Sequence, residues 1–408
     1  MWNYAKTFLK WVLFATVIGL LCGGIGTLFY FAVQKATQLR TTHDWLLYLL
    51  PVAGMAIAGL YHLAGMDRDE GTNLVIESIR TQRTPPGRMA PLIFVATVLT
   101  HLCGGSSGRE GAALQIGGSV GAFVGRKTRL DPKDLRIMMM CGMAAVFSAL
   151  FGTPLTATLF SMGVISVGVL YYAAFIPCLY SSLIAYGVAQ WAGASAESFP
   201  LVQAPAFQPL AVVQVTALSI LCALVGILFC VAMHKSGALY QRLLPNPYLR
   251  AAVGGLLVIG VTLLCGSRDY NGAGTEVIAR AMAGQAVPWA FLLKILMTAL
   301  TLGAGFKGGE IVPAFFIGAT FGCVAAPILG LSAPFGAAIG LVAVFCSVVN
   351  CPLASLMLST ELFGSSHLPL FAVACAVSYL FSGPYSLYHS QKLVYSKLST
   401  TYVNADTK

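Results

Sequence analysis

The stretch Gly142-Met-Ala-Ala-Val-Phe-Ser-Ala-Leu-Phe-Gly-Thr-Pro-Leu155 has a counterpart in the second half of the chain, Gly340-Leu-Val-Ala-Val-Phe-Cys-Ser-Val-Val-Asn-Cys-Pro-Leu353. Glycine, Ala-Val-Phe and Pro-Leu recur at the same places. Upstream, Gly108-Arg-Glu-Gly-Ala-Ala-Leu-Gln-Ile-Gly117 lines up with Gly309-Glu-Ile-Val-Pro-Ala-Phe-Phe-Ile-Gly318, and the two offsets are 198 and 201 residues. Matches in one order and at nearly one spacing predict an internal repeat.

The repeat divides the chain into two halves of one membrane domain covering residues 1–408. We expect the first repeat at about 10–192 and the second at about 210–398, followed by a short tail at 399–408. Residues 193–209 are rich in small residues, Pro and Ser, and are typical of a connector. Repeats of this kind usually place the substrate near the middle of the bilayer, where both halves contribute broken helices.

Composition requires a membrane protein. Of the 408 residues, 57% are hydrophobic and only 9% are charged, whereas a soluble domain carries about 25% charged residues. Four long runs lack Asp, Glu, Lys and Arg, namely 11–34, 45–66, 137–196 and 311–360. Since a spanning helix needs about 20 apolar residues, the longer runs hold several segments each. We predict a multi-pass α-helical membrane protein.

The formal net charge of +10 comes from basic residues near the ends of the apolar segments. Lys6, Lys10 and the loop 126–136 are expected on the cytoplasmic side, where basic residues concentrate. No aromatic-basic surface motif accompanies them, so nucleic acid is not an expected partner. The eleven cysteines lie scattered in apolar stretches without ligand spacing, so we expect no metal and no cofactor.

The segment Gly104-Gly-Ser-Ser-Gly-Arg-Glu-Gly111 has the composition of an anion site. Glycines expose successive backbone N–H groups, and the helix that follows adds its positive dipole end. Glu110 competes for the same place, which suggests a gate. Ionised Glu110 would occupy the anion's position, and protonated Glu110 would swing away. The alternative is a structural ion pair between Glu110 and Arg109.

The second half repeats this design in Gly305-Phe-Lys-Gly-Gly-Glu-Ile-Val-Pro313. Glu310 is a candidate proton carrier or anion partner, and Pro313 suits the first turn of a helix. The alternative for Glu310 is an ion pair with Lys307. A third helix start, Gly71-Thr72-Asn73, supplies polar donors for an inner gate.

These motifs, in this order, resemble the CLC family of chloride channels and proton-coupled anion antiporters over roughly residues 10–398. The resemblance implies two inverted homologous halves, many tilted and half-spanning helices, and a homodimer. It also implies that Glu110 is the gating glutamate. The anion-binding candidates that the family pattern indicates are Thr72, Asn73, Gly108, Arg109, Gly111, Ile311, Val312 and Tyr388.

Three departures indicate one branch of that family. Gly71-Thr72-Asn73-Leu74-Val75 replaces the chloride-coordinating serine stretch, Val164 stands where chloride antiporters carry an internal glutamate, and Glu310 is an added acid. The combination is similar to the fluoride/proton antiporter branch, and it implies fluoride export in exchange for protons. Val312, where that branch often has threonine, and Ala112, in place of proline, depart from its pattern.

Two alternatives remain open at the level of sequence. A chloride or nitrate antiporter or channel of the same family would use the same helix starts. A hydrolase within the membrane would use Ser106 or Ser107 with His101 and Glu110, although we do not expect an enzyme. The expected partners are fluoride, or chloride or other small anions, together with protons, membrane lipid and a second copy of the chain. The segments 154–191 and 352–381 are expected to pack across the dimer.

Overall fold

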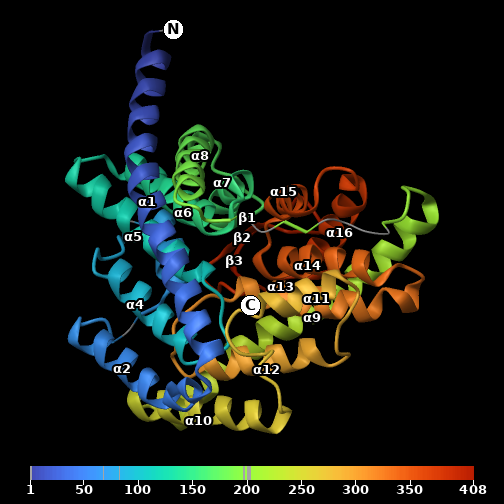
Figure 1. The fold of residues 1–408 in the computed structure, drawn as a ribbon. Helices are drawn as coiled ribbons and strands as arrows, with labels where there is room; N and C mark the ends of the chain where they lie inside the picture. The colour runs from blue at the N-terminus through green and yellow to red at the C-terminus, as the bar shows by residue number, and fades with distance from the viewer. Residues whose placement is uncertain (1, 68, 82, 196–197, 200–203) are drawn as a thin grey trace.

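The computed structural model describes residues 2–67, 69–81, 83–195, 198–199 and 204–408. Helices dominate these residues (Figure 1), in agreement with the predicted fold class. The sixteen α-helices of the described residues are α1 (Trp2–Thr42), α2 (Leu50–Leu63), α3 (Thr72–Arg80), α4 (Met89–Leu102), α5 (Glu110–Lys127), α6 (Pro132–Phe151), α7 (Pro154–Gly163), α8 (Phe175–Trp191), α9 (Pro209–Leu243), α10 (Pro247–Cys265), α11 (Thr275–Met282), α12 (Ala290–Gly303), α13 (Ile311–Ala325), α14 (Ala333–Val349), α15 (Pro352–Phe363) and α16 (Leu368–Phe381).

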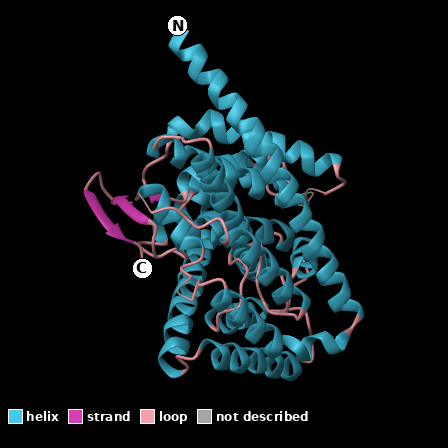
Figure 2. Cartoon of the chain, turned by 90° about the vertical axis from the view of Figure 1, so that its left-hand side faces the viewer, coloured by secondary structure: helices cyan, strands magenta, loops and turns pink. Residues whose placement is uncertain are grey.

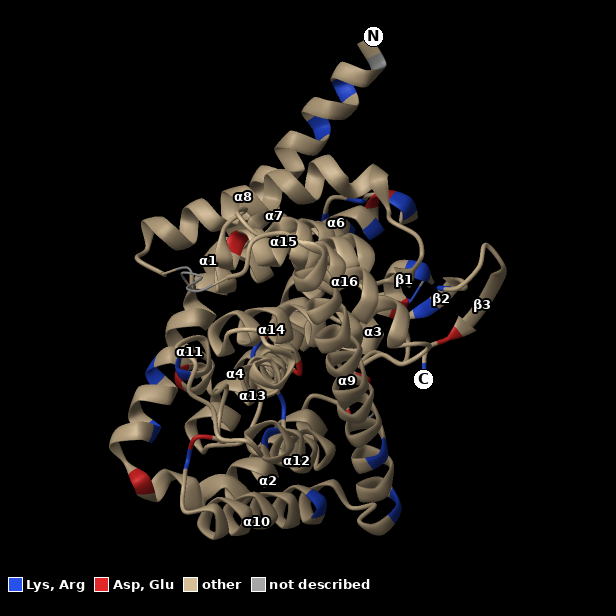
Figure 3. Cartoon of the chain, turned by 90° about the vertical axis from the view of Figure 1, so that its right-hand side faces the viewer, with Lys and Arg blue, Asp and Glu red and all other residues tan. Residues whose placement is uncertain are grey.

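Six helical segments are long and apolar enough to cross a membrane, and further apolar helices are only 10–17 residues long. This mixture confirms the expectation of short helices beside full spans. Charged residues lie mostly near loops and helix ends (Figure 3). Lys10 of α1 forms an ion pair with Asp134 of α6, which places the two basic segments of the sequence at the same end of the molecule.

Each half contains one helix pair held together by glycines. In α5 and α6, a Cβ added to Gly117 would lie 2.2 Å from the carbonyl oxygen of Gly142. In α13 and α14, a Cβ added to Gly318 would lie 2.3 Å from the carbonyl oxygen of Gly340. Small residues allow such close backbone approach in membranes. The same packing device therefore recurs at equivalent positions of the repeat.

The helices that follow the repeated Pro-Leu, α7 and α15, also pack on each other. The carboxylate of Glu361 in α15 accepts hydrogen bonds from the backbone N–H groups of Leu155 and Thr156, both at 2.9 Å, and from the Thr156 hydroxyl at 2.6 Å. These bonds satisfy N–H groups that the first turn of α7 leaves free. A residue of the second half thus caps a helix of the first.

The predicted connector lies between α8 and α9. Of residues 193–209, positions 196–197 and 200–203 lie outside the described residues. Within the described part, the backbone N–H of Phe199 donates to the carbonyl of Leu362 at 2.9 Å. The connector therefore contacts the end of α15.

A small sheet, absent from the sequence-based expectation, stands at one side of the helical body (Figure 2). It consists of β1 (Ser166–Val167), β2 (Lys392–Tyr395) and β3 (Tyr402–Asp406); β1 runs parallel to β2, and β3 runs antiparallel to it. After β3, the Thr407 hydroxyl donates to the carbonyl of Tyr388 at 2.8 Å. The predicted tail 399–408 therefore packs against the segment that carries Tyr388.

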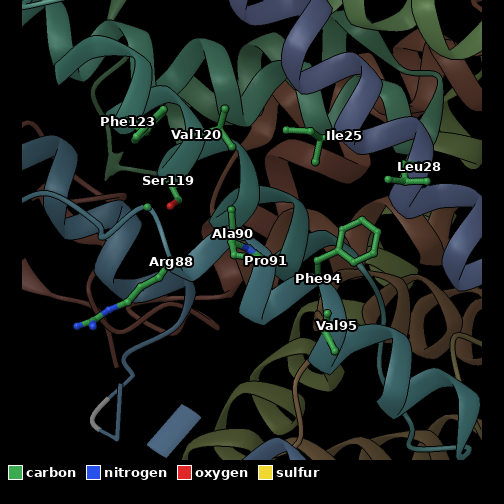
Figure 4. Close-up of a pocket in the computed structure, with 11 residues that line it drawn as sticks. Ile25, Leu28, Arg88, Ala90, Pro91, Phe94, Val95, Ser119, Val120 and Phe123 are labelled. Carbon is green, nitrogen blue, oxygen red and sulfur yellow. The ribbon is translucent and has the colours of Figure 1, made fainter. Parts of the chain in front are cut away.

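An apolar groove of about 720 Å³ lies between α1, α4 and α5 (Figure 4). The side chains that line it include Ile25 and Leu28 of α1, Phe94 of α4, and Val120 and Phe123 of α5. Such a surface suits contact with the hydrocarbon of a bilayer. The groove therefore belongs to the outer surface of the helical body.

Candidate functional site

The two glycine-rich loops meet and bond to each other directly. The N–H of Gly108 donates to the carbonyl of Gly309 at 2.7 Å, and the N–H of Gly309 donates to the carbonyl of Gly108 at 2.8 Å. Helices α5 and α13 begin immediately after this bridge. The structure therefore brings the two positive helix ends to one place, as expected for an anion site.

Glu110 lies at the first residue of α5 and is completely buried. Its Oε2 accepts a hydrogen bond from the backbone N–H of Val312, in the other half, at 3.2 Å. A Cβ added to Gly108 would lie 2.2 Å from the same oxygen and would displace the carboxylate, whereas a Cβ added to Gly309 would also lie 2.6 Å from the backbone nitrogen of Gly111, so position 309 requires glycine. The Oε1 atom has no hydrogen-bond partner among the described residues. The Glu110 carboxylate thus accepts a hydrogen bond from a backbone N–H group that could otherwise bind an anion.

Glu310 precedes α13 as its N-cap residue, but its side chain makes no capping hydrogen bond. Its buried Oε2 has no partner among the described residues. Lys307, the predicted structural partner, instead forms an ion pair with Asp69 at 2.6 Å and lies 4.3 Å from the centre of the Tyr61 ring. The structure therefore places the Lys307 ammonium on another carboxylate.

Thr72, the first residue of α3, contacts the first turns of α5. Its hydroxyl donates to the carbonyl of Gly111 at 3.3 Å and accepts from Nε2 of Gln115 at 3.2 Å. The sequence analysis missed Gln115, although it lies one turn after Gly111, on the same face of α5. Its Oε1 is buried and without a partner among the described residues. Thr72 and Gln115 therefore form a polar pair beside the loop.

Asn73, the neighbour of Thr72, is directed elsewhere. Its Oδ1 accepts hydrogen bonds from the N–H and hydroxyl of Ser390, at 3.1 and 2.9 Å. The amide oxygen of Asn73 therefore ties α3 to the segment that carries Tyr388.

Tyr388 is 1% exposed, and its hydroxyl has no partner among the described residues. It lies close enough to Glu310 and Glu110 for electrostatic interaction with both. Gln391, which the sequence analysis also missed, donates from Nε2 to the carbonyls of Val164 and Val349, both at 2.9 Å. Because Gln391 is fully buried, it fixes the Tyr388 segment against both halves. The side chain of Val164 is apolar, so position 164 supplies no ionisable group to this region.

Two polar cavities adjoin the loops. One, of about 480 Å³, is lined by Arg40, His101 and Arg109 among others, and the second, of about 250 Å³, by Asp69 and Lys307 among others. The first is lined mainly by α1, the loop 268–274 and the start of α11, and the second by α2, α9, α10 and the loop 304–307. Arg109 stacks over the rings of Tyr30 and Phe151, at 5.1 and 5.3 Å from their centres. We call the cavity of about 480 Å³ the Arg40 cavity and the cavity of about 250 Å³ the Lys307 cavity.

The comparisons with known proteins agree with this arrangement. Residues 53–383 match the family model described as voltage gated chloride channel. The chain belongs to this family, which we abbreviate CLC. A chloride/fluoride channel protein of Pseudomonas syringae pv. tomato is 40% identical over 397 residues, which cover 95% of this chain and 87% of the relative. An H⁺/Cl⁻ exchange transporter of Vibrio parahaemolyticus is 26% identical over 88% of this chain and 83% of its own length.

Solved structures also resemble this CLC chain. A CLC-type fluoride/proton antiporter superposes with a TM-score of 0.91 at 33% identity, covering 94% of this chain and 98% of its own. A slow cyanobacterial Cl⁻/H⁺ antiporter gives a TM-score of 0.77 at 20% identity, covering 91% and 94%. The second likeness concerns the fold alone. Together they confirm the predicted family and the architecture of two inverted halves.

The residues proposed for a hydrolase are not arranged as a nucleophile and its base in this CLC chain. The Ser106 hydroxyl bonds to that of Thr298 at 3.1 Å, and the Ser107 hydroxyl has no partner among the described residues. Nε2 of His101 bonds to the carbonyl of Gly108 at 3.1 Å. A nucleophile and its base need direct hydrogen-bond contact. In the part of the chain that the structure describes, no group of three or more His, Cys, Asp and Glu could hold a metal ion.

Proposed function

We propose that this CLC chain is a proton-coupled antiporter that exports fluoride in exchange for protons. The observation that supports this most strongly is the pair of acids, Glu110 and Glu310, beside the Gly108–Gly309 bridge that joins the two halves. Glu110 is held by a backbone N–H of the second half, and Glu310 stands one residue beyond the Gly108–Gly309 bridge with a buried oxygen that has no described partner. Ionisable residues inside a membrane mark ion or proton pathways.

The geometry supports an exchange mechanism. Ionised Glu110 accepts the Val312 N–H bond, and an anion would need the same donor. Protonation removes the charge of the carboxylate, so the side chain leaves and the anion replaces it. Reversal of these steps releases the proton on the other side. One site therefore holds either an anion or the negative charge of Glu110, which couples the two movements.

Fluoride suits this site chemically. It is small and strongly hydrated, so strong donors must replace its water. A protonated carboxyl group is such a donor, and Glu310 can present one. The Tyr388 hydroxyl, fully buried and without a described partner, is a second candidate donor. The remaining proposed contacts are Thr72, Asn73, Gly108, Arg109, Gly111, Ile311 and Val312.

The inward proton gradient supplies the energy for outward movement of the anion. One charge moved across 100 mV corresponds to about 2.3 kcal/mol, so an inward proton gradient can drive a small anion out. The relatives support the choice of ion, because one is named a chloride/fluoride channel protein and another is described as a fluoride/proton antiporter. We further propose the bacterial inner membrane as its location and a homodimer with one pathway in each subunit, packed through 154–191 and 352–381.

A chloride antiporter is the second candidate, because Val312 brings no hydroxyl to the site. Efflux of fluoride and of chloride from proteoliposomes, with simultaneous measurement of proton uptake, separates the two. We expect fluoride efflux to exceed chloride efflux by at least about tenfold, which corresponds to ~1.4 kcal/mol of differential binding. Equal efflux of the two ions would favour the chloride alternative, and efflux without proton uptake would indicate a channel.

A further inference from the structure

Arg40, in the last turn of α1, is a buried cation that forms no ion pair with a described residue. It is only 8% exposed. Its guanidinium makes no hydrogen bond or ion pair with any residue that the structure describes, and its Nε is buried and unpartnered. A buried charge is costly unless something compensates it. Because Arg40 lines the Arg40 cavity, that compensation can come from a ligand.

His101 directs a second unpartnered atom into the same region. Its ring is fixed by the bond from Nε2 to the carbonyl of Gly108, so Nε2 carries the hydrogen. This leaves Nδ1 as an acceptor, and Nδ1 is buried without a partner among the described residues. A Cβ added to Gly272 would lie 3.0 Å from Nη2 of Arg40 and 3.9 Å from Nδ1 of His101. The two side chains therefore converge on one small space beside Gly272.

The other charged residues that line the Arg40 cavity have partners of their own or are exposed. Arg268 pairs with Asp44, and Asp269 pairs with Arg280 at 2.6 Å. Arg109 stacks on two aromatic rings. Glu276 also lines the cavity and attracts the Arg40 charge through space, but it is exposed and forms no ion pair with Arg40. Arg40 is thus the buried cation of this cavity that forms no ion pair with a described carboxylate.

We propose that Arg40 and His101 form a second anion site, which holds a small hydrated anion between the pore loops and the solvent. The guanidinium of Arg40 contacts the ion, and a water of its hydration shell donates to Nδ1 of His101. A cavity of about 480 Å³ is large enough for an ion with water. The His101–Gly108 hydrogen bond joins this site to the pore loop. The anion regains its water here after leaving the donors at Glu110.

The identity of the anion as fluoride rests on the proposed function, whereas the existence of the site does not. Bromide is therefore a suitable probe, because its anomalous X-ray scattering locates it in crystals of the full chain. We expect a bromide peak beside Arg40 in the wild type. The matched control is Arg268→Gln, which removes a cation from the same cavity but one already paired with Asp44. The peak should persist in Arg268→Gln and disappear in Arg40→Gln.

Transport gives an independent readout. In Arg40→Gln the fluoride concentration for half-maximal transport should rise at least about threefold, a difference of roughly 0.6 kcal/mol, with the maximal rate retained. Arg40→Lys keeps the charge and should stay near the wild type, which guards against a folding defect in Arg40→Gln. Glu276→Gln removes the competing carboxylate and should leave the concentration equal or lower.

The outcomes separate the site from the function. A bromide peak in a protein that moves no fluoride would overturn the proposed function and support the site. Normal fluoride transport with no peak beside Arg40 would overturn the site and leave the function intact. An equal loss of affinity in Arg40→Gln and Arg268→Gln would also contradict the proposed site. The loss would then reflect the total positive charge of the cavity rather than a contact between Arg40 and the anion.

Discussion

The two glycine-rich loops pair through reciprocal backbone hydrogen bonds, but the acids that follow them have different surroundings. In the first half, Glu110 is part of α5, is completely buried, and accepts a bond from the N–H of Val312. In the second half, Glu310 precedes α13, and its buried Oε2 accepts no bond from a described residue. The acids differ by one position relative to the glycine bridge, since Arg109 and Glu310 each follow a bridging glycine.

This one-position difference has a physical consequence. The side chain at the first helical position points back across the glycines to the opposing helix start, where N–H groups stabilise a negative charge. At the preceding position, the buried Oε2 of Glu310 accepts no hydrogen bond from a described residue. Glu110 is therefore suited to exchange with an anion, and Glu310 is suited to hold or pass a proton. The predictions below test this division of roles.

The largest effect is expected for Glu110→Gln. The amide cannot ionise, so it can no longer compete with the anion in a charged form or release a proton. Proton coupling should be lost, whether or not anion flux persists. The measurement is proton uptake during fluoride efflux from proteoliposomes. Coupling at the wild-type ratio in this variant would place the proton carrier elsewhere.

Glu310→Gln should abolish coupled transport or slow it by about a hundredfold, as typical for loss of a positioned acid–base group. Glu310→Ala should be worse, because Gln at least keeps a donor. The matched control is Glu361→Gln, since Glu361 is a carboxylate of the second half whose hydrogen bonds cap α7. That variant should unfold at a lower temperature and keep the coupling ratio. Normal transport by an unstable Glu310→Gln would make Glu310 a structural residue.

Thr72→Val should reduce the preference for fluoride over chloride by about tenfold, since one buried hydrogen bond contributes roughly 1–3 kcal/mol when a partner is left unsatisfied. The loss would free both the Gly111 carbonyl and Gln115. Thr156→Val is the control, because its hydroxyl bonds to Glu361 instead. It should lower stability without changing the ion preference. Equal selectivity changes in both variants would argue against a contact between Thr72 and the ion.

The smallest effects concern packing, in which the two halves should behave alike. Gly117→Ala and Gly318→Ala should each lower stability by about 1–3 kcal/mol, because the added methyl overlaps a backbone carbonyl. Gly260→Ala is the control, since a Cβ there meets no atom within 4 Å. It should be neutral or stabilise by about 0.4–1 kcal/mol. Thermal unfolding in detergent measures all three. Loss of stability in only one half would show that the repeat is not equivalent in packing.

The sequence was sufficient for the parts of the molecule that local motifs encode. Gly108, Glu110 and Glu310 could be located because glycines before a helix start, with an acid among them, have a direct electrostatic meaning. The contacts between distant segments could not be predicted. Lys307 pairs with Asp69, 238 residues away, and Asn73 with Ser390, 317 residues away. Such partners depend on how the helices are placed.

Two polar residues and the small sheet were missed for related reasons. Gln115 and Gln391 each stand singly among apolar or loop residues, and only the fold shows that they bridge segments. The strands β1 and β2 are two and four residues long, too short for an alternating pattern to distinguish them from loops. Their pairing depends on the packing of α7 near the end of the second half.

The most direct test of the central claim is the direction of proton movement when a fluoride gradient alone is imposed across proteoliposomes. Antiport predicts that fluoride leaving the vesicles drives protons inward, even against a modest proton gradient. Passive leakage of hydrogen fluoride would instead carry fluoride and protons outward together, and protein-free vesicles measure that background. Inward proton movement in the wild type, lost in Glu110→Gln, is the result we expect. Fluoride efflux with no inward proton movement would contradict the account.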